Sequence, residues 1–254
     1  MRHTEYGERP DAVALGIWQI SNRWEMFMRT LLMTATTLGL LAMGLACGED
    51  RVASDSNRDI SNVNSSIQVA DGEHAGNLHT VNGSISIGEH AIINSAQTVN
   101  GSVRLGADGR ASSLTTVNGS VTIGKRSVVS GNVKTVNGRI ELSDEAVVQG
   151  DAKNVNSEIS IGQRAHVSGR VTTSTGDITL HENAKVDGGI HVEENNSWFG
   201  GLFDFFSRTP VVSIGAGAQV GGELIFDRDV VLRVHPTAKI GPVKGAKVQR
   251  TSSP

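Results

Sequence analysis

Histidine, serine and the acidic residues are the side chains of this sequence that could bind a metal ion or perform catalysis. Three of the eight histidines, His74, His79 and His90, stand close together in the sequence, and three histidines can ligate a zinc ion. They occupy no common position in the internal repeat of this sequence, and no nucleophile is placed beside a general base. We therefore expect no catalytic group, no metal, no cofactor and no enzymatic activity.

The charge balance argues against a protein dedicated to nucleic acids. The 254 residues include 23 Lys and Arg against 26 Asp and Glu, which gives a formal net charge of −3. A nucleic-acid-binding domain would carry a clear basic excess. The single cysteine also excludes a disulfide within the chain and a zinc site built from several cysteines.

That cysteine, Cys47, follows an uncharged and mostly apolar segment, residues 31–46, with Arg29 before it. A membrane-spanning helix needs about 20 apolar residues, so this shorter run is typical of a signal peptide. Ala46, directly before Cys47, is the small residue that cleavage requires. The alternative is an ordinary secretory signal followed by an incidental cysteine.

The segment Met43-Gly44-Leu45-Ala46-Cys47 resembles the lipobox of bacterial lipoproteins, although Gly44 stands where that motif usually has Leu. The resemblance implies cleavage before Cys47, acylation of its thiol and attachment to a membrane. Gly48, rather than Asp, after the cysteine implies the outer membrane of an exported protein.

The front of the chain is accordingly divided into three segments. Residues 26–46 are predicted to be the lipoprotein signal peptide, beginning at Met26 or Met28. Residues 1–25 then form an upstream extension or a misassigned start. The polar residues 47–59 are expected to be a tether.

The body of the chain is an internal repeat. The tetrapeptide Thr-Val-Asn-Gly occurs four times, and weaker copies flank it. The asparagines recur at a nearly constant interval of about 18–19 residues, a period that indicates a solenoid. They are Asn64, Asn82, Asn100, Asn118, Asn137 and Asn156.

Each repeat contains short β-branched segments separated by turn residues, as in Val81, Ile85, Ile87 and Ile93. Alternation predicts that Val81, Ile85 and Ile87 share the inward face of a strand. The fold class that follows is all-β: a single-stranded parallel β-helix of triangular section over residues 60–248, followed by a tail at 249–254. A left-handed hexapeptide helix shares this period. The extra apolar residues and the lengthening of the later repeats by one position favour the right-handed form.

Two polar columns run along this predicted helix. The asparagines are expected to form a ladder of stacked amides at one corner, with the following glycines supplying a positive φ. A column of threonines is expected to face outward beside it, either as a binding face or through the ordinary preference of Thr for strands. Its members are Thr80, Thr98, Thr116, Thr135 and Thr173.

An aromatic insertion at 193–210 interrupts the repeat, which resumes at Val211. Such a density of apolar side chains predicts a contact with a partner or membrane, or a flap that covers the helix. The candidate residues are Trp198, Phe199, Leu202, Phe203, Phe205 and Phe206.

The coils typified by Val-Asn-Gly-Ser-Val-Thr-Ile-Gly at 117–124 resemble the polymer-forming bactofilin β-helix proteins. The resemblance implies a scaffold that assembles end to end, although typical members of that family are cytoplasmic. We therefore expect a lipid-anchored envelope scaffold that forms homo-oligomers or filaments. The alternative is an adhesin-like module whose Thr/Asn face or aromatic loop binds a glycan or an envelope protein.

Overall fold

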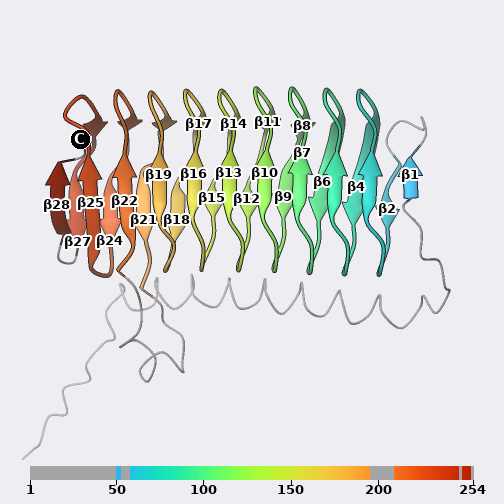
Figure 1. Cartoon of the computed structure of the whole chain (residues 1–254), viewed down its shortest axis with the longest axis horizontal. Coiled ribbons are helices and arrows are strands. Elements are labelled where there is room, and N and C mark those ends of the chain that lie inside the picture. The colour runs from blue at the N-terminus through green and yellow to red at the C-terminus, as the bar shows by residue number, and fades with distance from the viewer. Residues whose placement is uncertain (1–49, 53–57, 195–208, 246–247, 253–254) are drawn as a thin grey trace, which may run out of the picture. The chain divides into compact units, whose positions relative to one another are not determined.

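The computed structural model describes residues 50–52, 58–194, 209–245 and 248–252. Within these ranges the protein contains strands and turns but no helix. All strand pairings are parallel, and the chain winds through about nine turns of a β-solenoid (Figure 1). The predicted all-β solenoid class is confirmed.

Each coil contributes to three faces. Face 1 is an 11-stranded sheet, and each strand pairs with the equivalent strand of the neighbouring coil. Its strands are β1 (Asp50–Val52), β3 (Ile67–Val69), β5 (Ile85–Ile87), β7 (Val103–Leu105), β10 (Val121–Ile123), β13 (Ile140–Leu142), β16 (Ile159–Ile161), β19 (Ile178–Leu180), β22 (Val211–Ile214), β25 (Val230–Val234) and β28 (Val248–Ser252).

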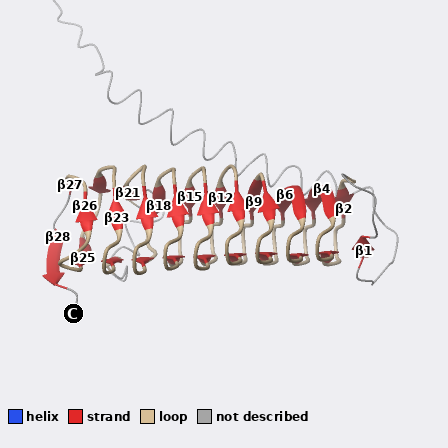
Figure 2. Ribbon diagram, turned by 90° about the horizontal axis from the view of Figure 1, so that it is seen from above, coloured by secondary structure: helices blue, strands red, loops and turns tan. Residues whose placement is uncertain are grey.

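Faces 2 and 3 belong to one 17-stranded sheet, because two long strands, β4 (His74–His79) and β6 (Ile92–Gln97), contribute to both. Figure 2 shows strands of face 3 side by side in one row. Face 2 continues with β8 (Arg110–Ala111), β11 (Val128–Val129), β14 (Val147–Val148), β17 (His166–Val167), β20 (Lys185–Val186), β23 (Gln219–Val220) and β26 (Lys239–Ile240). Face 3 contains β2 (Ile60–Ser61), β9 (Ser113–Thr115), β12 (Val133–Lys134), β15 (Ala152–Lys153), β18 (Val171–Thr173), β21 (Ile190–Val192), β24 (Leu224–Phe226) and β27 (Val243–Gly245).

The core is a column of aliphatic side chains enclosed by the three faces. In the coil that begins at β10, Val121, Ile123, Val129 and Val133 are fully buried. Equivalent positions of neighbouring coils pair directly, as Val121 does with Val103 and Ile140. Apolar side chains therefore stack on side chains of similar size, and Phe226 is the single aromatic residue in the core of the described ranges.

The lengthening of the coil by one position occurs at one corner. On face 2, Val129 pairs with Ala111, and on face 3, Val133 pairs with Leu114. Ala111 and Leu114 are three residues apart in their coil, whereas Val129 and Val133 are four residues apart in the next coil. The extra residue therefore lies between Val129 and Val133.

Two expected boundaries differ from the structure. Asp50–Val52 forms β1 and pairs with β3, so part of the predicted tether at 47–59 belongs to the first coil. Val248–Ser252 forms β28 and pairs with β25, so most of the predicted tail at 249–254 is a strand. Each terminal segment gains backbone hydrogen bonds by adding to the exposed end of a stack.

The expectation that Val81 shares the inward face with Ile85 and Ile87 is wrong. Ile85 and Ile87 are buried, but Val81 is only partly buried and lies in a bend. The side-chain alternation of a strand does not continue through this bend, so the inward residue before it is Thr80. The missed inward column lies on face 3 and includes Leu78, Ala96, Leu114, Val133, Ala152, Val171, Ile190 and Leu224.

A pair of substitutions on β10 tests this arrangement. Val121→Asp places an unpaired carboxylate in the core and is expected to destabilise the protein by several kcal/mol, on the order of the cost of burying a charge without a partner. Thr122→Asp, on the outward position of the same strand, is expected to cost about 0.5 kcal/mol or less. Thermal melts of the two variants check this, and the reverse order of stability would show that the strand register is wrong by one residue.

Candidate functional site

The asparagine corner, where the chain passes from face 3 to face 1, joins the coils through a continuous ladder of side-chain amides. Each Asn Nδ2 donates to the Oδ1 of the Asn one coil before, at 2.6–2.9 Å. The ladder contains Asn64, Asn82, Asn100, Asn118, Asn137 and Asn156. Thr175 Oγ1 extends it by one coil through a contact of 3.2 Å with Asn156 Oδ1. The amides lie on the surface, so the corner combines cohesion between coils with an exposed polar edge.

The threonine column does not face outward as expected. All five threonines are at most 2 % exposed. Four of them, at positions 80, 98, 116 and 135, donate Oγ1–H to a main-chain carbonyl of the preceding coil at 2.7–2.9 Å. A hydroxyl can occupy this buried position because the carbonyl satisfies its hydrogen bond. The predicted Thr/Asn face therefore has no exposed threonines.

The glycines after the asparagines also have a different role from the expected one. None of them has a positive φ. A Cβ at Gly101 or Gly119 would overlap the main-chain carbonyl oxygen of the glycine one coil before. The absence of a side chain therefore permits the close approach of successive corners, and this is what lets the threonine hydroxyl reach its acceptor.

Asn154 interrupts the threonine column. Its side chain is fully buried, and its Nδ2 donates to the carbonyl oxygen of Ser157, which stands where other coils have Gly. Its Oδ1 finds no hydrogen-bond partner among the described residues. An unsatisfied buried carbonyl costs stability, so this coil departs locally from the regular repeat.

The turn ridge, the row of tight turns between face 1 and face 2, is a feature that sequence reasoning missed. Six non-glycine residues in it have φ values of 55–61°. They occupy the same position in successive coils and are His90, Asp108, Arg126, Glu145, Arg164 and Asn183. Gly72 and Gly217 at equivalent positions, together with Asp108 and Asn183, are the residue types that could have indicated the left-handed conformation from sequence.

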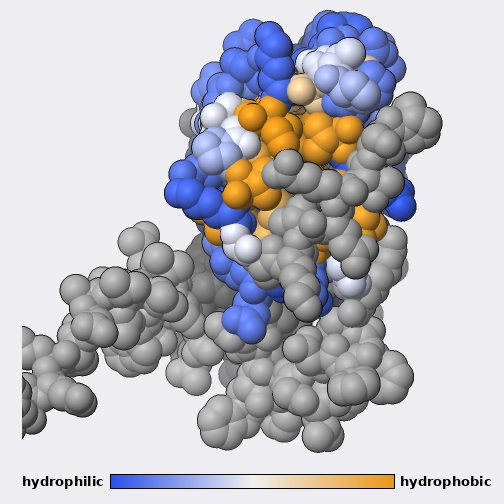
Figure 3. Space-filling model, turned by 90° about the vertical axis from the view of Figure 1, so that its left-hand side faces the viewer, coloured by the Kyte–Doolittle hydropathy of each residue, from blue (hydrophilic) through white to orange (hydrophobic). Residues whose placement is uncertain are grey.

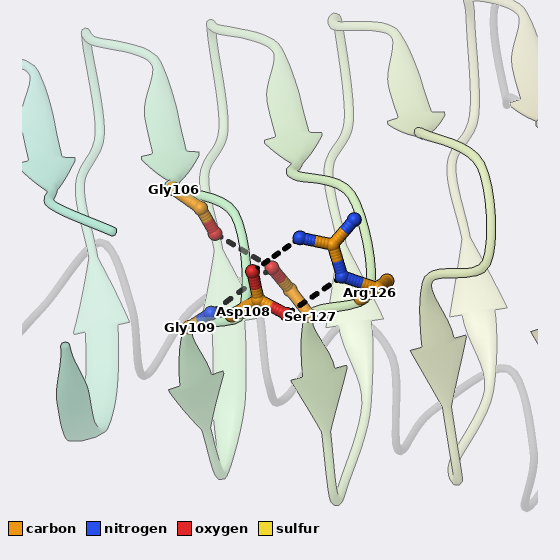
Figure 4. A network of polar contacts seen from close by, with 5 residues as sticks. All are labelled: Gly106, Asp108, Gly109, Arg126 and Ser127. Carbon is orange, nitrogen blue, oxygen red and sulfur yellow. Dashed lines mark hydrogen bonds and ion pairs between the residues drawn. The ribbon is translucent and has the colours of Figure 1, made fainter. Parts of the chain in front are cut away.

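Ion pairs between coils run along this ridge. Arg126 contacts Asp108 through two hydrogen bonds of 2.6 and 2.9 Å (Figure 4). Arg164 likewise contacts Glu145, two coils farther along. The Arg126 guanidinium holds the pKa of Asp108 below its usual range. Beneath this pair, the buried Ser127 donates to Gly106 O and accepts from Gly109 N. The ridge is thus held by polar contacts both at the surface and below it.

The base of the aromatic insertion carries a second set of polar contacts. Glu193 pairs with Lys153 at 2.7 Å, across two coils. On the returning side, Val211 N donates to Asp177 Oδ1 at 2.8 Å. Arg228 Nη1 donates to Ser174 O at 3.1 Å. These contacts attach the chain segments before and after the insertion to the preceding coils.

Several predicted residues cannot be placed. Cys47 and the six apolar residues of the insertion, between Trp198 and Phe206, lie outside the described residues.

In the described ranges no helix is long and apolar enough to cross a membrane. No cluster of three or more His, Cys, Asp or Glu side chains in those ranges could hold a metal ion. Burial lowers the pKa of His79, one of the three histidines considered as ligands.

The end of the stack formed by β26, β27 and β28 exposes part of the core. Val234, Ala238, Ile240 and Val243 pack against the buried cluster but are themselves only partly buried. Apolar side chains gather on this end of the molecule (Figure 3). At the other end, Ile60 of β2 is also only partly buried, while Ile67, Val69 and Ala75 are at most 3 % exposed.

Comparison of the sequence with protein-family models and with curated proteins, and of the fold with solved structures, finds no match.

The inward threonines generate a direct test. Thr116→Val keeps the shape of the side chain but leaves the Gly101 carbonyl without its partner at 2.7 Å. We expect a loss of about 1–3 kcal/mol in the free energy of unfolding. Thr122→Val is the matched control, because Thr122 lies on the outward position of β10. Denaturant unfolding of both variants makes the measurement, and equal stabilities would contradict the inward role of Thr116.

Proposed function

We propose that this protein is a non-enzymatic structural scaffold of the bacterial cell envelope, held on a membrane through Cys47 and assembling end to end. The observation that carries the assembly is the incompletely covered end of the stack. Val234, Ala238, Ile240 and Val243 occupy core positions there but retain exposure to solvent. Exposed apolar patches of this kind mark sites of association.

The strand edges at this end support the same proposal. Among the described strands, β26 and β27 each pair with a single neighbour, β23 and β24. Their outer edges carry backbone donors and acceptors that a further strand could satisfy. A second copy of the chain is the partner that fits, because its own coils have the same three-sided section and the same spacing of about 4.8 Å between strands.

The resemblance to bactofilin-type repeats and to the lipobox adds the envelope location and the filament form to this proposal. The Asn ladder and the turn-ridge ion pairs support a scaffold role in a different way. Both connect one coil to the next along the axis, so they stiffen the stack over its length. At the opposite end, β2 pairs only with β4 among the described strands, and its Ile60 is partly buried. A stiff rod with an open strand edge at each end is a suitable building unit for a filament.

Ile240→Lys tests the assembling end. The charged side chain is expected to prevent association while leaving the core of the other coils intact. Lys239→Glu is the matched control, because Lys239 is exposed on the same strand. Sedimentation and negative-stain microscopy of the full chain in mild detergent should show concentration-dependent rods or filaments for the wild type and the control, and single rods for Ile240→Lys. Single rods for the wild type at all concentrations would contradict the proposal.

Cys47→Ser tests the anchor separately. An acylated Cys47 should place the protein in the membrane fraction and in the detergent phase. The serine variant should be released in soluble form or accumulate as the uncut precursor. An unchanged membrane fraction for the variant would contradict lipidation at this residue.

A further inference from the structure

A groove of about 470 Å³ lies where face 1 meets the turn ridge, across the coils of β13, β16 and β19. Its lining is predominantly polar and combines hydroxyl, amide, imidazole and charged groups. The side chains that matter here are Lys125, Glu141, Asp144, Ser160, Gln163 and His181. The groove belongs neither to the associating end nor to the Asn ladder.

The groove exists because of one column of residues that follows the strands of face 1. In most coils this position is glycine, but here Ser143, Gly162 and His181 occupy it in succession. A Cβ at Gly162 would lie 2.6 Å from the carbonyl oxygen of Leu142, so this position cannot readily accept a side chain. The result is a gap one coil high between the side chains of Ser143 and His181.

The polar groups around this gap are arranged on opposite sides. On the face 1 side, Ser160 Oγ lies 3.2 Å from His181 Nε2, and Glu141 stands beside Ser160 on the neighbouring strand. On the ridge side, Lys125 pairs with Asp144 at 3.6 Å. Gln163 N also donates to Asp144 Oδ1, at 3.2 Å. Hydrogen-bonding groups therefore face the same space from two elements of the fold.

The balance of charge in the groove determines what it can bind. Lys125 and Asp144 neutralise each other. Glu141 forms no hydrogen bond or ion pair with another described residue, so its carboxylate is the unbalanced charge. It favours a cationic group and opposes an anion. The remaining hydroxyl, amide and imidazole groups match ligand hydroxyls.

We propose that this groove binds an amino sugar, with the ammonium group at Glu141 and the hydroxyls at Ser160, His181 and Gln163. The groove is open to solvent, so the bound unit can be part of a longer glycan. Polar groups make up the larger part of its lining, and the side chain of Leu142 is buried in the core. Binding of the amino sugar is independent of end-to-end assembly, since the groove residues lie in the middle of the stack.

Ligand-observed NMR titrations of the full chain test the proposal with three probes: glucosamine, glucose and inorganic phosphate. Glucosamine should bind most tightly, glucose more weakly and phosphate not at all. Glu141→Gln should weaken glucosamine binding about tenfold or more, because a charge-assisted hydrogen bond is lost. His181→Ala should weaken glucosamine and glucose alike. Arg104→Ala is the control, because Arg104 occupies the same outward row of face 1 on an earlier coil.

The proposal is overturned by the absence of glucosamine binding, by an unchanged glucosamine affinity in Glu141→Gln, or by competition from phosphate for the same site. A groove that binds glucose as tightly as glucosamine would also overturn it, because Glu141 would then play no part in selecting the ligand. Thermal melts of each variant confirm that these substitutions, all at surface positions, leave the coil folded.

Discussion

Parallel hydrogen bonding between successive coils is the constraint on which the rest of this structure depends. A single coil cannot pair its own backbone groups, so the coils before and after it must satisfy them. Equivalent residues are therefore forced into columns, and each column must repeat one kind of contact along the axis. Aliphatic residues stack in the core, amides stack at the asparagine corner, and opposite charges alternate on the turn ridge. The short spacing between coils also explains why glycine follows four of the six asparagines, since a Cβ at Gly101 or Gly119 would meet a carbonyl oxygen of the coil before.

Much of this architecture could be predicted from the repeat alone. The spacing of Asn82, Asn100 and Asn118 indicates the coil, and the alternation around Val121 gives the inward face of its strand correctly. The direction of Thr116 could not be predicted in the same way, because side-chain alternation ends at the bend that follows it. The carbonyl that accepts its hydrogen bond lies one coil away, and no local pattern reports that contact.

The left-handed turns and the groove were missed for a related reason. Asp108 and Arg126 adopt a conformation usually associated with glycine, and contacts with the neighbouring coils support it. The sequence around His181 does not indicate its neighbours, because only the register between coils places it next to Gly162 and beside Ser160. Both features depend on which residues of neighbouring coils lie next to each other. The repeat indicates that the coils are aligned, but it does not specify these contacts. The regular repeat is interrupted at particular positions, and these are Ser143 and His181 in the glycine column, Asn154 in the threonine column and the incompletely covered end.

Native-state hydrogen exchange measured by mass spectrometry tests the central claim most directly. If each coil is stabilised by its neighbours, amides of central strands such as β10, β13 and β16 should exchange most slowly. Protection should fall toward β2 at one end and β27 at the other, because the terminal coils have a neighbour on one side only. Uniform protection along the chain, or faster exchange at the centre than at the ends, would contradict a stack held together by contacts between coils.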